Sequence, residues 1–171
     1  MKRIVDQQMS FSMSTNQATA TPEDLSEFER SILIEAPRKK VWSVLADIGS
    51  IHEWNPGLEK SNQASKGVVK KGSTRRCDLP GNHYLDEEVV FWQPGQALTM
   101  RIIGTDLPFK KADIRFTLTD HEQGTRVTVS PLYQLKFGAL GRLMDKLIVR
   151  KQYQKGMGNI LEGLKDKLQS V

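Results

Sequence analysis

The C-terminal part of the chain carries a hydrophobic pattern that predicts one long helix. Between residues 139 and 169, apolar side chains recur at spacings of three and four, which places them on one stripe of an α-helix. They are Leu140, Leu143, Met144 and Leu147, followed by Met157, Ile160, Leu161, Leu164 and Leu168. Such a helix extends about 46 Å, whereas a compact domain of this size has a radius of gyration of about 15 Å. The helix must therefore cross the whole domain.

The middle of this helix has an unusual composition. Residues 150–156 carry no aliphatic side chain, and Gly156 and Gly158 leave bare backbone where a core helix normally places bulk. Two interpretations stay open: the helix bends at this place, or a space lies beside it.

The preceding residues predict mostly β-strands. Residues 28–36 alternate with the period of a strand, and two short helices follow, after Pro37 and up to Asn55-Pro56-Gly57. From Leu58 onward, alternating segments are separated by turn residues. The expected strands are 73–79, 83–92, 97–103, 111–119 and 125–135, preceded by a polar hairpin around residues 66–72.

This order of elements indicates an α+β domain. Strands and helices are segregated along the chain, so we expect helices on one face of an antiparallel sheet of about seven strands, curved around the long helix. Residues 1–24 are polar and lack either hydrophobic period, so we expect a mobile tail before a single domain at 25–171.

Composition excludes several classes of protein. The longest apolar runs are too short for a transmembrane segment, and residues 1–10 lack the apolar region of a signal peptide, so we expect a soluble, cytoplasmic protein. The net charge of +5 is concentrated in residues 138–171. This positive charge has two interpretations: a surface that binds phosphate groups or a membrane, or the solvated outer face of the helix. Basic and aromatic residues do not alternate in the way typical of single-stranded nucleic-acid binding, so no nucleic-acid partner is expected.

Metal and cofactor sites are not predicted. His52, His83 and His121 are far apart in the sequence and lack ligand spacings. Cys77 is the single cysteine, interpreted as a small buried hydrophobic residue of a strand, with a reactive thiol as the alternative. The glycines form neither a phosphate-binding loop nor a dinucleotide fingerprint. We therefore expect no metal, no cofactor and no nucleotide.

Several segments resemble a known family. FERSILIEAP, VWSVLADIGSIHEWNPGL, EEVVFWQPGQALTMRI, GTRVTVS and GALGRLMDKLI are similar to the START-like superfamily of polyketide cyclase and dehydrase-related proteins (SRPBCC), over about residues 28–169. The most specific matches are Val41-Trp42, Asp47 and Trp54-Asn55-Pro56. The resemblance implies the helix-grip fold of the birch allergen, with a hydrophobic cavity between sheet and helix for a lipid, polyketide or other apolar molecule; some members catalyse cyclisation or dehydration.

Three functions follow as hypotheses. The first is binding of a small hydrophobic ligand by cavity residues, for which the candidates are Trp54, Tyr84, Trp92, Met100, Phe109, Phe116, Tyr133, Met157, Ile160 and Leu161. Large apolar side chains with few polar handles suit such a site, although each of them equally suits a filled core. A polyketide cyclase, aromatase or dehydratase is the second, and a protein-interaction module, which uses the basic helix face or the tail, is the third. Whether the chain forms a dimer stays open.

Catalysis would fall to the acidic run Asp86-Glu87-Glu88. Because neighbouring side chains of a strand point to opposite faces, at least one carboxylate faces the concave side of the sheet. Glu87 or Glu88 would there act as a general acid or base. The alternative is a cross-strand ion pair with Arg75, Arg76 or Arg101.

Overall fold

The computed structural model describes residues 25–170, so the tail expected at residues 1–24 lies outside the described residues. The chain begins with strands β1 (Ser26–Glu27) and β2 (Arg30–Ile34), followed by helix α1 (Arg38–Ala46) and the 3-10 helix η2 (Ile48–Glu53). Six strands come next: β3 (Lys60–Gln63), β4 (Thr74–Leu79), β5 (His83–Gln93), β6 (Ala97–Thr105), β7 (Phe109–His121) and β8 (Gly124–Leu135). The C-terminal helical run consists of α2 (Gly138–Met144), the π-helical segment η3 (Asp145–Val149) and α3 (Arg150–Gln169).

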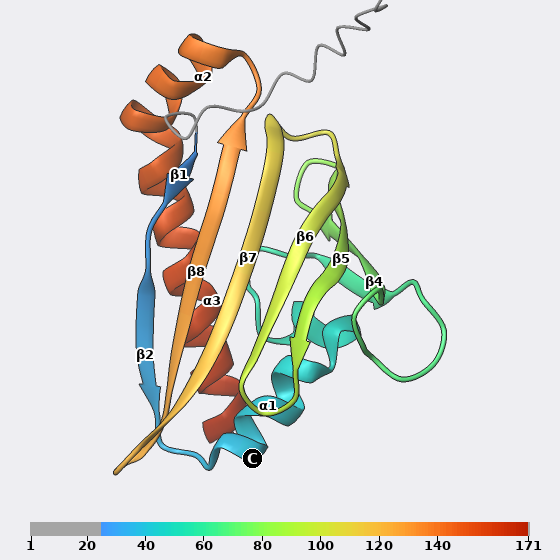
Figure 1. The fold of residues 1–171 in the computed structure, drawn as a ribbon, viewed down its shortest axis with the longest axis vertical. Coiled ribbons are helices and arrows are strands. Elements are labelled where there is room, and N and C mark those ends of the chain that lie inside the picture. Colours follow the sequence, from blue (N-terminus) through green and yellow to red (C-terminus); the bar gives the residue numbers. More distant parts are fainter. Residues whose placement is uncertain (1–24, 171) are drawn as a thin grey trace, which may run out of the picture.

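The strands form one antiparallel sheet, which confirms the predicted fold class. Its order is β1-β8-β7-β6-β5-β4-β3, and β2 also pairs with β8. Strands β3 to β8 are thus a continuous meander, in which each strand pairs with the next one in the sequence. The sheet curves, with α3 along its inner face near β2 and β8 and with α1 at one end (Figure 1). This is the helix-grip arrangement.

The core lies between α3 and the concave face of the sheet. The α3 side chains at helical spacing, Met157, Ile160, Leu161, Leu164 and Leu168, are all buried. Alternate side chains of the strands meet them, among them Val89, Met100, Phe116, Val127 and Val129. Complete burial of such side chains contributes about 1.5–3 kcal/mol each. The second half of the predicted stripe is therefore confirmed as the core face of the helix.

A close backbone contact fixes α3 against the end of η2. A Cβ atom on Gly163 would lie 1.8 Å from the carbonyl oxygen of Trp54. No side chain fits in that distance, so glycine is required where the helix crosses this carbonyl. The contact positions the preceding turns of α3, which face the sheet.

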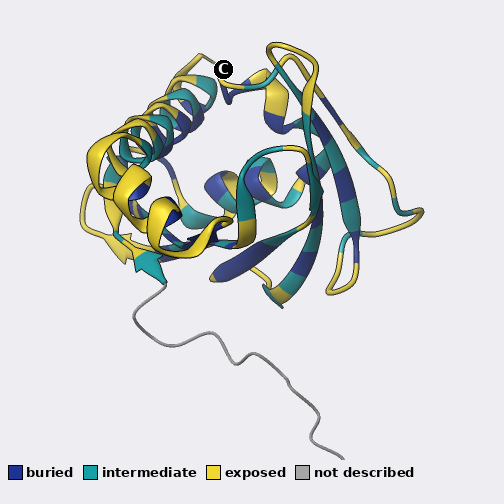
Figure 2. Ribbon diagram, turned by 90° about the horizontal axis from the view of Figure 1, so that it is seen from above, coloured by how far each residue is buried: buried dark blue, intermediate teal, exposed yellow. Residues whose placement is uncertain are grey.

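The prediction for the first half of the stripe was wrong. Leu140, Leu143, Met144 and Leu147 are exposed, and the residues that α2 and η3 bury are Gly141 and Asp145. A Cβ atom on Gly141 would lie 2.2 Å from the carbonyl oxygen of Lys136, so this turn lies directly against the chain that leaves β8. Figure 2 shows this end of the helical run in the colour of exposed residues. The apolar residues of the first half do recur at helical spacing, but among the described residues no other element covers their side chains.

A candidate ligand cavity between sheet and helix

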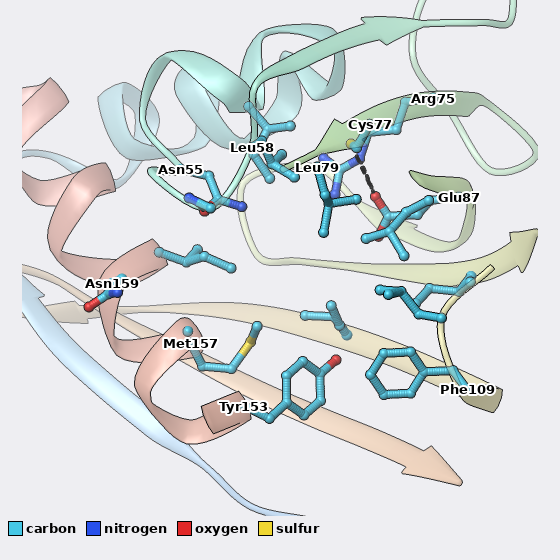
Figure 3. A pocket seen from close by; sticks show the side chains of 18 of the residues that line it. Asn55, Leu58, Arg75, Cys77, Leu79, Glu87, Phe109, Tyr153, Met157 and Asn159 are labelled. Carbon is cyan, nitrogen blue, oxygen red and sulfur yellow. Dashed lines mark hydrogen bonds and ion pairs between the residues drawn. The ribbon is translucent and has the colours of Figure 1, made fainter. Parts of the chain in front are cut away.

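A cavity of about 250 Å³ lies between α3, the inner face of the sheet and the loop after η2 (Figure 3). The helical side and the loop contribute Ile51, Asn55, Gly57, Leu58, Tyr153, Gly156, Met157, Asn159 and Ile160. The sheet and the β6–β7 loop contribute Arg75, Cys77, Leu79, Leu85, Glu87, Ile102, Leu107, Phe109, Ile114 and Phe116. Most of these side chains are apolar, and the polar ones are few. That composition is typical of small-molecule sites.

Gly156 provides part of this space. It lines the cavity, and a Cβ atom placed on it would meet no other heavy atom within 4 Å. Gly158 likewise has nothing within 4 Å, but it does not line the cavity. The helix α3 runs through both glycines without interruption. Of the two interpretations, a bend or a space beside the helix, the space is found at Gly156. The irregular turn of the helical run lies earlier, at η3.

The structure places four of the ten candidate ligand-binding residues at the cavity: Phe109, Phe116, Met157 and Ile160. Trp54, Met100 and Leu161 are buried in the core but do not line it.

The remaining three candidates have other partners. Arg76 lies over the ring of Tyr84, with its guanidinium carbon 3.8 Å from the ring centroid. Trp92 contacts Trp42, with centroids 4.9 Å apart. Tyr133 lies in a separate buried cluster, where its hydroxyl donates to Asp145 Oδ1 at 2.5 Å. None of the three lines the cavity.

A buried ion pair forms one polar wall of the cavity. Arg75 Nε donates to Glu87 Oε2 at 2.7 Å, and both side chains are almost inaccessible to water. Arg75 also donates to the carbonyl oxygen of Ile48 at 3.4 Å, and the thiol of Cys77 donates to Glu87 Oε2 at 3.5 Å. Period 2 explains the arrangement, because Arg75 and Cys77 on β4 and Glu87 on β5 all face inward.

The other acids of the run lie elsewhere. Asp86 accepts from Arg76 at 2.8 Å on the outer face, and Glu88 does not line the cavity. Arg101, the third expected partner, pairs with Asp113 at 2.8 Å instead. The cross-strand pairing expected as the alternative to catalysis is thus present for Glu87, with Arg75. Glu87 is also the only member of the run that reaches the cavity.

Electrostatics determine the protonation states of Arg75 and Cys77. Burial opposes the charge of Arg75, but the attraction of Glu87 and Cys77 and their hydrogen bonds together raise the pKa of the guanidinium. Burial raises the pKa of the Cys77 thiol to about 12, so the thiol is protonated at neutral pH. A protonated thiol is a poor nucleophile and a poor metal ligand. Cys77 therefore serves as a small wall residue and a weak donor.

Tyr153 supplies a free hydrogen-bond donor. Its hydroxyl is buried and has no hydrogen-bond partner within residues 25–170. Burial, with the nearby negative charge of Glu87, raises its pKa, so it stays a protonated phenol. Figure 3 shows the hydroxyl pointing into the cavity. Buried hydroxyls nearly always have partners, so one without a partner that faces a cavity indicates a place for a ligand atom.

Sequence reasoning missed Tyr153, Arg75 and Cys77 as cavity residues. The signal for Tyr153 was present, because it lies three residues before Gly156 and four before Met157 and so shares their helix face. For Arg75 and Cys77, period 2 was the only signal, and it does not tell which of the two faces is concave.

Neither a metal-binding cluster nor a membrane-spanning helix occurs in the part of the chain that the structure describes. Residues 25–170 contain no group of three or more His, Cys, Asp or Glu side chains placed to hold a metal ion. Nor is any of their helices long and apolar enough to cross a membrane.

Residues 26–169 match the family described as "Polyketide cyclase / dehydrase and lipid transport". The chain belongs to this family. The match covers all strands and helices of the structure, so the resemblance noted from short motifs extends over the whole domain. No curated protein is significantly similar to the chain.

Several solved structures share the fold of the chain. A protein of Thermus thermophilus is 20% identical, with a TM-score of 0.69, over 85% of this chain and 97% of that one. The ZhuI aromatase/cyclase of Streptomyces sp. R1128 is 15% identical, with a TM-score of 0.70, over 85% and 94%. A START superfamily protein of Mycobacterium smegmatis is 15% identical, with a TM-score of 0.70, over 84% and 97%. At these identities the likeness shows the fold alone.

Proposed function

We propose that the chain binds a small hydrophobic molecule in the cavity between α3 and the sheet. The main support is a mostly apolar cavity of about 250 Å³, part of which is empty because Gly156 has no side chain. An apolar cavity of about 150 Å³ already binds benzene, and ligand pockets usually begin near 300 Å³. The size therefore suits a molecule of one or two rings or a short acyl chain. Removal of its apolar surface from water stabilises the complex by about 25 cal/mol per Å².

The ligand of this proposal has an acceptor oxygen. The Tyr153 hydroxyl donates, has no partner of its own among the described residues and faces the cavity. A carbonyl, hydroxyl or ether oxygen of the ligand within hydrogen-bond reach would satisfy it and gain about 0.5–1.5 kcal/mol. An anionic ligand fits less well, since the charge of Arg75 is already paired with Glu87. The proposed ligand is thus neutral or nearly so.

The test is to identify what the purified protein retains. Denaturing extraction followed by mass spectrometry is expected to detect one small apolar compound. If the protein is first freed of ligand, the neutral dye N-phenyl-1-naphthylamine is expected to bind once per chain, with enhanced fluorescence. A protein that retains nothing and does not enhance the dye would contradict the proposal.

A cyclase or dehydratase is the second candidate, favoured by the position of Glu87. Its carboxylate lies at the cavity beside Arg75, so it would accept a proton while the guanidinium stabilises a developing enolate. Glu88 does not reach the cavity. With a poly-β-ketone substrate, Glu87→Gln is expected to abolish cyclisation and Glu88→Gln to leave it unchanged. Equal turnover of the two variants would contradict this candidate.

The proposal includes a cytoplasmic location. The single cysteine, Cys77, is a free buried thiol, which suits a reducing compartment. Fractionation of cells with an antibody against the chain checks it, and recovery from the secreted fraction would contradict it.

A further inference from the structure

The beginning of the C-terminal helical run carries a large exposed apolar surface, here called the apolar patch. Its members, Phe137, Leu140, Leu143, Met144, Leu147 and Ile148, are each between 39% and 68% exposed. The other large hydrophobic residues exposed in the described part of the chain, Val68, Phe91 and Ile103, are scattered over different strands and loops. Contiguous apolar surface of this kind on a folded domain usually marks a binding surface.

In this segment the polar face of the helix is turned toward the domain and the apolar face is turned toward solvent. The face turned to β8 consists of Gly141 and Asp145, whereas the leucines face outward. Asp145 is held in place by the hydroxyls of Ser26, at 2.6 Å, and Tyr133, at 2.5 Å. These two bonds fix the polar face inward. The outward orientation of the apolar patch is thus determined by specific contacts on the opposite side of the helix.

Basic residues surround the apolar patch. Residues 136–155 contain six cations, Lys136, Arg142, Lys146, Arg150, Lys151 and Lys155, all of which are exposed. The single acid in the same range, Asp145, is buried. An apolar helix face flanked by lysine and arginine is the composition of helices that lie in the interface of a membrane. The expectation of a merely solvated basic face does not explain why its hydrophobic residues are exposed.

We propose that the apolar patch docks on the surface of an anionic phospholipid bilayer. The leucines and Phe137 enter the boundary between head groups and acyl chains, and the surrounding cations contact lipid phosphates and carboxylates. The helix lies on the bilayer and does not span it, which agrees with the absence of a spanning helix among the described residues. Each cation near an anionic surface contributes about a fivefold increase in partitioning, from about 1 kcal/mol.

Charge distinguishes this occupant from a second copy of the chain. In a symmetric dimer the same patch is present on both sides, so the six cations of one copy would face the six of the other. Facing like charges disfavour such a contact. An anionic bilayer offers both an apolar layer and the opposite charge.

The apolar patch adjoins one wall of the cavity. The backbone N–H of Lys136 donates to the carbonyl oxygen of Pro108 at 2.8 Å, and its ammonium group donates to that of Leu107 at 3.3 Å. Leu107 of the same loop and Phe109, the first residue of β7, line the cavity. Membrane docking does not depend on a ligand in the cavity, so it goes beyond the proposed function and can be tested separately.

The test is co-sedimentation of the full chain with vesicles. Binding to phosphatidylcholine vesicles that contain phosphatidylserine is expected, with much weaker binding to phosphatidylcholine alone and a decrease as salt is added. The variant Leu143→Ser with Leu147→Ser is expected to lower partitioning at least about tenfold, because it removes inserted apolar surface. Lys146→Gln with Lys151→Gln is expected to lower it about twenty-five-fold, from two lost cations.

Matched controls separate the patch from general effects. Ile103→Ser removes an equally exposed apolar residue on β6, and Lys71→Gln removes an exposed cation on a loop; both are expected to bind as the natural chain does. Gly156→Leu alters the cavity and is also expected to bind vesicles normally. Absence of vesicle binding, equal binding to neutral vesicles, or a dimer in solution that the leucine variant dissociates would overturn the proposal.

Discussion

Arg75 and Glu87 form a hydrogen-bonded ion pair, 2.7 Å from Nε to Oε2, on the wall of a mostly apolar cavity. Loss of one charge leaves the other buried without compensation, which typically costs about 3–5 kcal/mol. Glu87→Gln is therefore expected to lower the free energy of unfolding by several kcal/mol. Glu88→Gln, which does not touch the cavity, is its matched control and is expected to change stability by less than about 0.5 kcal/mol.

Urea unfolding of the two variants gives the comparison. The double variant Arg75→Leu with Glu87→Leu, which leaves no charge uncompensated, is expected to be more stable than Glu87→Gln. Equal stability of Glu87→Gln and Glu88→Gln would show that the pair is not buried as described.

The raised pKa of the Cys77 thiol implies that the free energy of unfolding depends on pH. Its pKa rises from 9.0 to about 12 on folding, chiefly because of burial. Below pH 9 both states are protonated and the contribution of the thiol is complete; between these two values the unfolded chain loses a proton that the folded chain keeps. Stability is thus expected to fall between about pH 8 and about pH 10, by about 1 kcal/mol more in the natural chain than in Cys77→Val. Parallel curves for the two proteins would contradict the shift.

Two glycines of α3 are expected to respond oppositely to alanine. Gly163→Ala would place a Cβ atom 1.8 Å from the carbonyl oxygen of Trp54, whereas the Cβ atom of Gly158→Ala would meet nothing within 4 Å. The first variant is expected to lose more than about 2 kcal/mol and the second to gain about 0.5–1 kcal/mol from helix propensity. Thermal unfolding measures both. A Gly163→Ala protein as stable as Gly158→Ala would mean that the helix crosses η2 at a greater distance.

Two tyrosines distinguish a ligand contact from a structural bond. Tyr153→Phe removes a hydroxyl with no partner among residues 25–170, so stability is expected to stay equal or rise, while affinity for a ligand with an acceptor oxygen falls about tenfold. Tyr133→Phe removes the bond to buried Asp145 and is expected to cost about 1–3 kcal/mol of stability, with ligand affinity unchanged. Calorimetric titration and urea unfolding provide the two readouts, and a large loss of stability in Tyr153→Phe would contradict the assignment.

Local periodicity predicted the fold well where one face of an element packs against the common core. The strand period of β4 and β5 and the helical period of residues 157–168 gave the sheet and its core helix, because these side chains face one common interior. The same helical period failed for Leu140 to Leu147. Periodicity identifies an apolar face, but only the path of the chain after Leu135 determines that the face meets no strand among the described residues.

The cavity was harder to predict than the fold for a related reason. Large aromatic residues such as Trp92 and Tyr133 were expected at the site, yet Trp92 contacts Trp42 and Tyr133 binds Asp145. A cavity exists where side chains are small or absent, as at Gly156 and Cys77, and the sequence shows which residues are small but not which ones face each other.

A matched pair of leucine variants tests whether the space beside Gly156 is a ligand site. Both Gly156 and Gly158 lie in α3 with no atom within 4 Å of a Cβ position, but only Gly156 lines the cavity. In fluorescence titrations with N-phenyl-1-naphthylamine, Gly156→Leu is expected to weaken binding at least tenfold, or about 1.4 kcal/mol, while Gly158→Leu binds as the natural chain does. Equal affinities of the two folded variants would contradict a ligand site in this cavity.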